Sequence, residues 1–270
     1  MTVVSADVSV TPGITIDERY RLESLLEGGQ GSSLWRGTDR VLNRSVAVQA
    51  FDPGAERLSE IFDAVRQASR LTHGGLAQVF DANEDADPPY FVREWLGGRD
   101  LAGVLTDGPL DPEWAVEAFR QSSAAIAAAH RAGVYHQRIG PGSMVWSKAG
   151  RIKVVGLAVD AALAGTRADD PQRADSQALA RLLGFALAGR WSSRRVLAHP
   201  SPVPAIRAWH ARQHGVGREL AAIAQRALGE GRDPLPMDQL ATDLDRLAYD
   251  CQRVGSGASV IPPHVEIERG

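Results

Sequence analysis

Cysteine is almost absent from the sequence. Only Cys251 occurs among 270 residues, so the chain cannot close a disulfide on its own, and this composition fits a reducing compartment. A single thiol on the apolar spacing of a helix is expected to be a small buried group rather than a nucleophile. This absence excludes a small secreted domain held together by disulfides.

Long apolar runs and an excess of cations are also missing. No stretch approaches the roughly 18 uninterrupted apolar residues of a membrane-spanning helix, and residues 1–13 lack the basic start and apolar run of a signal peptide. The formal net charge of -3 gives no overall basic field, so nucleic acid is not an expected partner. With 44% hydrophobic residues, the composition predicts a soluble, cytoplasmic globular chain with a buried core.

Short apolar stretches separated by turn residues dominate positions 16–96. The pattern predicts strands at 20–26, 33–38, 46–51, 77–82 and 90–96. A helix is predicted over 58–71, because apolar residues recur there at helical spacing. Residues 1–15 are small, polar and interrupted by proline and glycine, so we expect a loose leader there.

From position 111 onward the pattern becomes helical. Asp111 is a favourable N-cap for an alanine-rich helix that should stop at Gly133. A loop and two short apolar strands are expected to follow that helix. Further helices are predicted at 175–187, 218–228 and 237–251. Glycine, serine and proline accumulate beyond them, so 252–270 is expected to be a flexible linker.

The stretch over 133–158 resembles the catalytic loop and the metal-binding loop of protein kinases. That family writes H-R-D-x-K-P-x-N in a loop after a helix, and D-F-G after the second of two short strands. His136 and Pro141 match this frame. We expect His136 to be a packed core histidine rather than a general base.

Other phrases extend the resemblance to bacterial Hanks-type Ser/Thr kinases over 17–251. They include R-Y-x-L from Arg19 and V-A-V-x from Val46, in the order and spacing of that family. The resemblance implies an α+β bilobal fold, with a small N-lobe at 16–96 that is mainly β and contains one helix. A larger, mainly helical C-lobe would cover 97–251.

Six positions that carry chemistry in that family hold other residues here. Phosphoryl transfer uses a lysine on the phosphates, a glutamate that holds it, a base and metal-holding groups. Gln49 stands at the position of the strand lysine and Ala64 at that of its glutamate. In the catalytic loop, Arg138, Gly140 and Ser143 replace the aspartate, the lysine and the asparagine, and Gly156 replaces the aspartate of D-F-G. Arg138 cannot serve as a base, since the pKa of an arginine lies above about 12. We therefore expect a pseudokinase, a regulatory or scaffold domain that is not an enzyme and uses no cofactor or metal.

Two features near the expected nucleotide site each have two interpretations. Glu27 stands where the family has its first loop glycine and would repel a triphosphate, so Gly28 and Gly31 either cover a nucleotide or merely permit a hairpin turn. Arg93 either fills the space of an adenine or lies on the surface. An atypical nucleotide-binding enzyme with residual phosphotransferase activity is therefore the alternative function.

Two further clusters are weak candidates for sites. His210 and His214 have a zinc-capable spacing, but no third ligand is near in sequence. The run 190–195 mixes tryptophan with arginine and could touch anionic lipid, although such a run is more often a solvated loop.

Two threonines carry an aspartate at the third following position. FHA domains, which recognise phosphothreonine, often favour this T-x-x-D pattern, and it occurs at Thr166 with Asp169 and at Thr242 with Asp245. We expect an upstream Ser/Thr kinase to phosphorylate Thr242 ahead of Thr166, because Thr242 has acids at both the first and third following positions. The alternative is that neither threonine is used, since a pattern with two fixed positions is common by chance.

The arginine- and alanine-rich composition and the altered motifs resemble the intracellular pseudokinase segments of MurJ-type (MviN) lipid II flippases of mycobacteria. This resemblance implies a cytoplasmic domain tethered to the plasma membrane. It further implies a role in peptidoglycan precursor export and cell-wall synthesis.

Overall fold

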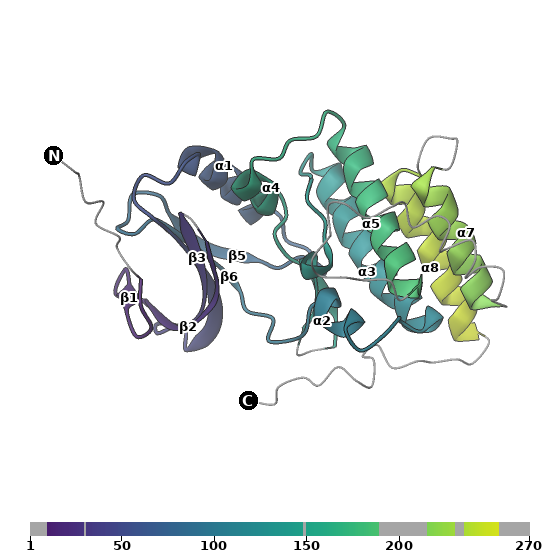
Figure 1. Cartoon of the computed structure of the whole chain (residues 1–270), viewed down its shortest axis with the longest axis horizontal. Coiled ribbons are helices and arrows are strands. Elements are labelled where there is room, and N and C mark those ends of the chain that lie inside the picture. The colour runs from purple at the N-terminus through teal and green to yellow at the C-terminus, as the bar shows by residue number, and fades with distance from the viewer. Residues whose placement is uncertain (1–9, 30, 148–149, 189–214, 230–234, 254–270) are drawn as a thin grey trace. The chain divides into compact units, whose positions relative to one another are not determined.

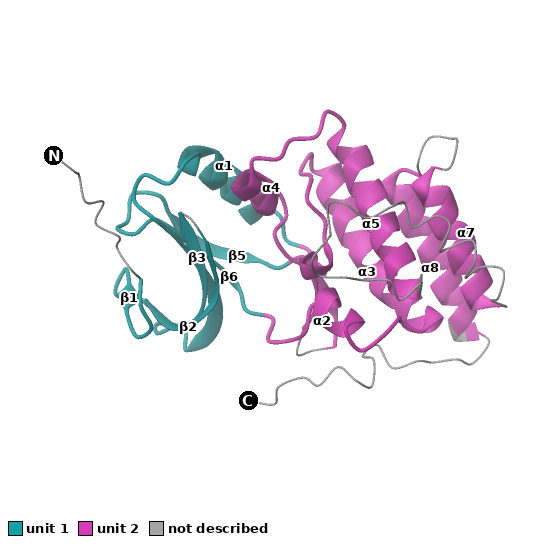
Figure 2. Ribbon diagram, in the orientation of Figure 1, with its two compact units in different colours: residues 1–72, 77–95 teal, residues 73–76, 96–270 magenta. Residues whose placement is uncertain are grey.

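The computed structural model describes residues 10–29, 31–147, 150–188, 215–229 and 235–253. These residues form two compact units, one over 1–72 and 77–95, the other over 73–76 and 96–270 (Figure 2). The first unit is a sheet with one helix, whereas the second is mainly helical (Figure 1). The predicted α+β class is thus confirmed.

The first unit is built on a six-stranded antiparallel sheet in the order β1-β2-β3-β4-β6-β5. Its strands are β1 (Thr15–Ile16), β2 (Tyr20–Gly29), β3 (Ser32–Asp39), β4 (Arg44–Phe51), β5 (Val79–Asn83) and β6 (Tyr90–Glu94). Alternation along these strands places Tyr20, Trp35 and Val48 in one buried cluster. Helix α1 (Leu58–Ser69) presents Phe62 to Phe51 of β4, with the two ring centroids 5.8 Å apart.

Residues 10–15 differ from the expected loose leader. The amide of Gly13 donates to the carbonyl of Leu22 over 2.7 Å, and Leu22 donates back to Ile14 over 2.8 Å. Thr15 and Ile16 then pair with β2. The backbone N–H and C=O groups along the edge of β2 pair with those of this segment. The segment is therefore ordered by backbone hydrogen bonds, although its polar side chains gave no sign of it. The remainder of the expected leader, 1–9, lies outside the described residues.

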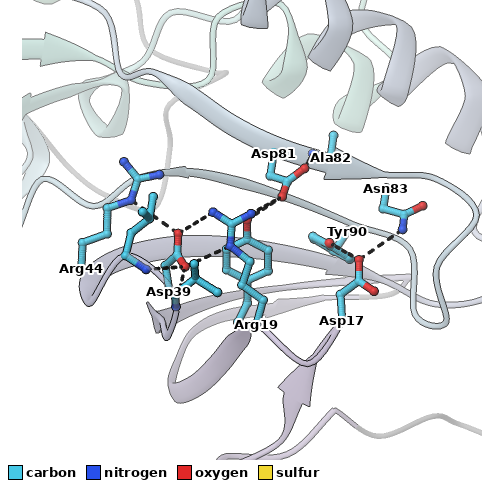
Figure 3. A network of polar contacts seen from close by, with 11 residues as sticks. Asp17, Arg19, Asp39, Arg44, Asp81, Ala82, Asn83 and Tyr90 are labelled. Carbon is cyan, nitrogen blue, oxygen red and sulfur yellow. Dashed lines mark hydrogen bonds and ion pairs between the residues drawn. The ribbon is translucent and has the colours of Figure 1, made fainter.

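The buried carboxylate of Asp39 ties together the end of β3 and the turn that precedes β2 (Figure 3). Arg19 donates to it through Nε at 3.0 Å and Nη2 at 2.8 Å. These hydrogen bonds hold the pKa of Asp39 at about 2, although burial raises the pKa of the group. Arg19 and the Tyr20 hydroxyl also donate to Asp81 on β5, at 3.3 and 2.5 Å. The network braces the sheet from its first strands to its last.

The second unit packs long helices against one another. They are α3 (Pro112–Arg131), α5 (Pro171–Ala188), α7 (Val216–Leu228) and α8 (Met237–Arg253), and they lie side by side (Figure 1). Shorter elements precede or link them: α2 (Leu101–Leu105), β7 (Met144–Trp146), β8 (Ile152–Val154) and α4 (Val159–Ala164). Helix α8 continues two residues past the predicted end at 251, and 254–270 lies outside the described residues.

Candidate functional site

The loop between α3 and β7 begins where the sequence predicts. Ala132 caps α3, and Gly133 follows with φ of +74°, a conformation that glycine adopts without strain. The amide of Val134 donates to the carbonyl of Ala129 at 3.0 Å, which closes the helix end. The chain is thereby turned toward His136.

Asp175 of α5 holds the next part of the loop. Its buried carboxylate accepts the amide of His136 through Oδ2 at 2.8 Å and the amide of Gln137 through Oδ1 at 2.6 Å. His130 Nε2 also lies 2.9 Å from Oδ2. Two backbone donors and one imidazole therefore converge on one carboxylate. Sequence reasoning recognised Asp175 only as the start of a helix, because its partners lie 38 to 45 residues away.

His136 is fully buried and joins the loop to the strand before Gly156. Its Nε2 lies 2.9 Å from the carbonyl of Val155, and its Nδ1 accepts the amide of Arg138 at 3.4 Å. This arrangement is that of a packed core histidine, as expected. Arg138 itself is exposed, and among the described residues its guanidinium has no hydrogen bond or ion pair.

Ser143 uses its hydroxyl within the loop. The side chain is 4% exposed, and Oγ accepts the amide of Gly140 at 3.1 Å. The carbonyl of Ser143 accepts the amide of Val155 at 2.9 Å, which places Ser143 beside the residue that precedes Gly156. The catalytic-loop and metal-loop positions of the kinase frame are thus brought together within the second unit.

Gly156 has φ of +79° and faces the side chain of Asp160. A Cβ at Gly156 would overlap the carboxylate of Asp160, which comes from the first turn of α4. The amide of Asp160 donates to the carbonyl of Gly156 at 2.9 Å and fixes this approach. A carboxylate therefore lies where a side chain of residue 156 would begin. Sequence reasoning missed Asp160, although an aspartate four residues after Gly156 within helix-compatible sequence was a usable signal.

Gln49 and Ala64 lie in the first unit. Gln49, on β4 between Leu34 and Phe91 of the neighbouring strands, is 9% exposed, and Ala64 on α1 is 8% exposed. Residues Gly28 and Gly29 end β2 and pair with Ser33 and Ser32 of β3, which is the geometry of a hairpin. Arg93 on β6 is half-buried, so its exposure alone does not decide between the adenine space and the surface.

The remaining candidates divide between the two parts of the chain. His210, His214 and the run 190–195 lie outside the described residues. Within the described ranges, no group of three or more His, Cys, Asp or Glu side chains is arranged to hold a metal ion. Cys251 is buried, and burial raises the pKa of its thiol. No helix in the described ranges is long and apolar enough to cross a membrane.

Thr242 of α8 is exposed, and its hydroxyl donates to the carbonyl of Asp238 at 2.8 Å. The side chain of Asp245 is 73% exposed and lies 3.4 Å from Arg120. Asp243, which we expected to help recognition, is instead 4% exposed and accepts from Arg226 at 2.9 Å. A helix turns by about 100° per residue, so the position after Thr242 faces the core while the third position returns to the surface.

Thr166 lies between α4 and α5 and is also exposed. Its amide and hydroxyl donate to the carbonyl of Ala161 at 3.0 and 3.3 Å. Asp169 is exposed as well. Both T-x-x-D sites thus present the threonine and the aspartate to solvent, one on a helix and one in an irregular segment.

Known proteins with similar sequences are named serine/threonine protein kinases. The chain is 31% identical over 164 residues to PknA of Mycobacterium tuberculosis, which covers 56% of this chain and 38% of that kinase. It is 31% identical over 154 residues to PknL of the same species, covering 55% and 39%, and 30% identical over 159 residues to PrkC of Bacillus subtilis, covering 57% and 24%. The chain is homologous to bacterial serine/threonine protein kinases. The aligned part spans less than half of these relatives, and no protein-family model matches the chain.

The expectation that this chain is not an enzyme is contradicted by these relatives. Their names point to a kinase rather than to a non-enzyme, over the 56% of the chain that aligns with PknA. That expectation compared each motif position of the kinases with the single residue that stands there in this chain. Such reasoning overlooks a group that arrives from a neighbouring element, as the carboxylate of Asp160 does at Gly156.

Proposed function

We propose that this kinase-like chain is a regulatory and scaffold domain that an upstream Ser/Thr kinase phosphorylates on threonine and that an FHA-domain protein then binds. The observation that carries the proposal is the joint exposure of Thr242 and Asp245 on α8. Residues three apart on a helix are neighbours on its surface. A phosphate on Thr242 and the carboxylate of Asp245 would therefore be presented together.

The cellular role that we propose is control of peptidoglycan precursor export. It rests on the resemblance to MurJ-type flippases, in which such a domain would be tethered to the plasma membrane as part of a longer chain. The similarity to PknA and PknL supports a bacterial signalling context, because both relatives are named Ser/Thr kinases.

The two threonines make different demands on a partner. FHA grooves bind extended peptide, so a phosphate at Thr242 requires α8 to unwind locally or the partner to contact the folded surface as well. Thr166 lies outside helices and needs no unwinding, but its segment is hydrogen-bonded at Ala161. We place Thr242 first because Asp245 is exposed beside it on the same face of α8.

Phosphorylation-dependent capture tests the proposal. The purified chain is phosphorylated with the PknA kinase domain, and its affinity for an isolated FHA domain is measured by calorimetry. Thr242→Ala should reduce the affinity by an order of magnitude or more, because charge-assisted hydrogen bonds to the phosphate are lost. Thr106→Ala is the matched control, since Thr106 is exposed but is followed at the third position by Pro109.

The outcomes separate the two sites. If Thr166→Ala abolishes binding while Thr242→Ala leaves it unchanged, the docking site is on the segment between α4 and α5. If neither substitution changes the affinity, the proposal is wrong.

A second candidate function is phosphotransfer, which the names of the relatives favour. A bound Mg²⁺ would neutralise charge on the phosphate oxygens. In proteins it commonly takes only one or two carboxylates, together with substrate phosphates. The carboxylate of Asp160 fits one such ligand, because it lies at the position from which a side chain of residue 156 would extend.

Thermal unfolding with Mg·ATP tests the second candidate without measuring activity. Ligand that binds only the folded state raises the melting temperature. Asp160→Asn should remove that rise, whereas Asp169→Asn, at an exposed position in the following segment, should keep it. A rise of equal size in both variants would exclude Asp160 as a ligand.

A further inference from the structure

The segment from Gly165 to Asp170 is fastened at both ends and near its middle. At its start, the amide of Thr166 donates to the carbonyl of Ala161 at 3.0 Å. At its end, Asp170 accepts the amide of Arg173 through Oδ1 at 3.0 Å and so caps α5. Between them, the amide of Ala168 donates to Oε1 of Gln137 at 3.2 Å. Among the hydrogen bonds of the described residues, this last one links the segment to a residue outside both the segment and its two flanking helices.

Gln137 is itself held in place. Its amide donates to the buried carboxylate of Asp175 at 2.6 Å, and its φ is +60°, so the surrounding structure must impose this conformation. The side chain is half-buried. Because the backbone of Gln137 is already fixed, less conformational entropy is lost when its side-chain oxygen accepts the amide of Ala168.

Phosphorylation commonly orders a segment by adding a charge that pairs with arginine. Here a hydrogen bond fixes the middle of the segment in the unphosphorylated chain, and the group that makes it is a neutral amide. Thr166 is exposed, and its hydroxyl donates to the carbonyl of Ala161 at 3.3 Å. A phosphate on this oxygen would remove that one bond and leave the bonds donated by the amides of Thr166 and Ala168. A phosphate at this position would therefore be added to a segment whose conformation is already set.

We propose that Gln137 fixes the 165–170 segment independently of phosphorylation, so that a phosphate on Thr166 acts as a ligand for a partner and not as a conformational switch. The part that concerns phosphate rests on the proposed function. The part that concerns Gln137 does not, because it can be measured on the unmodified chain.

Amide hydrogen exchange followed by NMR tests the role of Gln137. Gln137→Met keeps the length of the side chain and requires the same positive φ as glutamine, but it removes the acceptor oxygen. Exchange at Ala168 should then be faster by roughly fivefold, which corresponds to the loss of one ordinary hydrogen bond. Gln137→Glu keeps an acceptor oxygen and should preserve the protection. Gln172→Met, at an exposed position on α5, is the control and should leave Ala168 unchanged. Equal exchange in the Met variant and the wild type would overturn the proposal.

The phosphate is tested separately by installing phosphothreonine at position 166 through genetic code expansion. Exchange at Ala168 should change by less than about threefold, because the segment is already ordered. A larger change in either direction would overturn the independence from phosphorylation. Neither result depends on FHA binding, so failure of this inference and failure of the proposed function are distinguishable.

Discussion

Removing the carboxylate of Asp175 should loosen the loop and destabilise the second unit. Asp175→Ala takes away the acceptor for the amides of His136 and Gln137 and for the ring of His130. A buried donor left without a partner costs about 1 to 3 kcal/mol, and the amides of His136 and Gln137 would both lose their partner. We expect a loss of about 3 to 5 kcal/mol in the free energy of unfolding of this unit.

Asp175→Asn should cost less than Asp175→Ala, about 2 kcal/mol. The amide retains one acceptor oxygen, but its NH₂ group then faces a donor that it cannot satisfy. Because the chain has two compact units, global denaturation need not be two-state. Native-state hydrogen exchange of the α3 amides therefore reports the second unit directly.

Asp169→Ala is the matched control for this experiment. Its carboxylate is exposed in the segment that leads to the same helix, and a substitution there should stay within about 0.5 kcal/mol. An Asp175→Ala loss below about 1 kcal/mol would refute the reasoning, since the three contacts would then contribute little to stability.

Two other perturbations follow from the structure. Gly98→Ala would place a Cβ on the backbone carbonyl oxygen of Trp146, so we expect a loss of about 3 kcal/mol in a urea titration, whereas Gly140→Ala, which meets no atom within 4 Å, should cost far less. Asp39 contributes stability above its ordinary pKa of 3.8 and loses it as the pH falls toward the folded pKa of about 2, because Arg19 binds only the ionised form. Asp39→Asn should therefore be less stable at neutral pH and lose less further stability between pH 4 and 2; equal acid sensitivity in both proteins would contradict this assignment.

Local patterns predicted the secondary structure well. Helical spacing placed a helix at 58–71 and the structure has α1 at Leu58–Ser69, while the predicted 46–51 strand lies within β4. Periodicity records which side chains of an element face the core, so it indicates the element without identifying the strand or helix that it packs against. The α+β class followed from the resemblance to protein kinases and was confirmed.

Contacts between distant residues were not predicted. Asp175 binds the loop across 38 and 39 residues, and Gln137 binds Ala168 across 31, so no local pattern identifies either pair. Asp160 was missed because each kinase position was compared with one residue only. The partners and phosphorylation sites stay predictions, since they concern molecules outside this chain.

The way in which Asp175 holds the loop separates the path of the chain from its chemistry. The two amides that it accepts belong to the backbone, and every residue except proline can offer such a donor. The side chain of Arg138 meanwhile points to solvent and shares none of that task. A loop anchored through its peptide groups can therefore exchange its outward side chains while keeping its shape, so likeness of form to a kinase and likeness of reactivity can vary independently at this position.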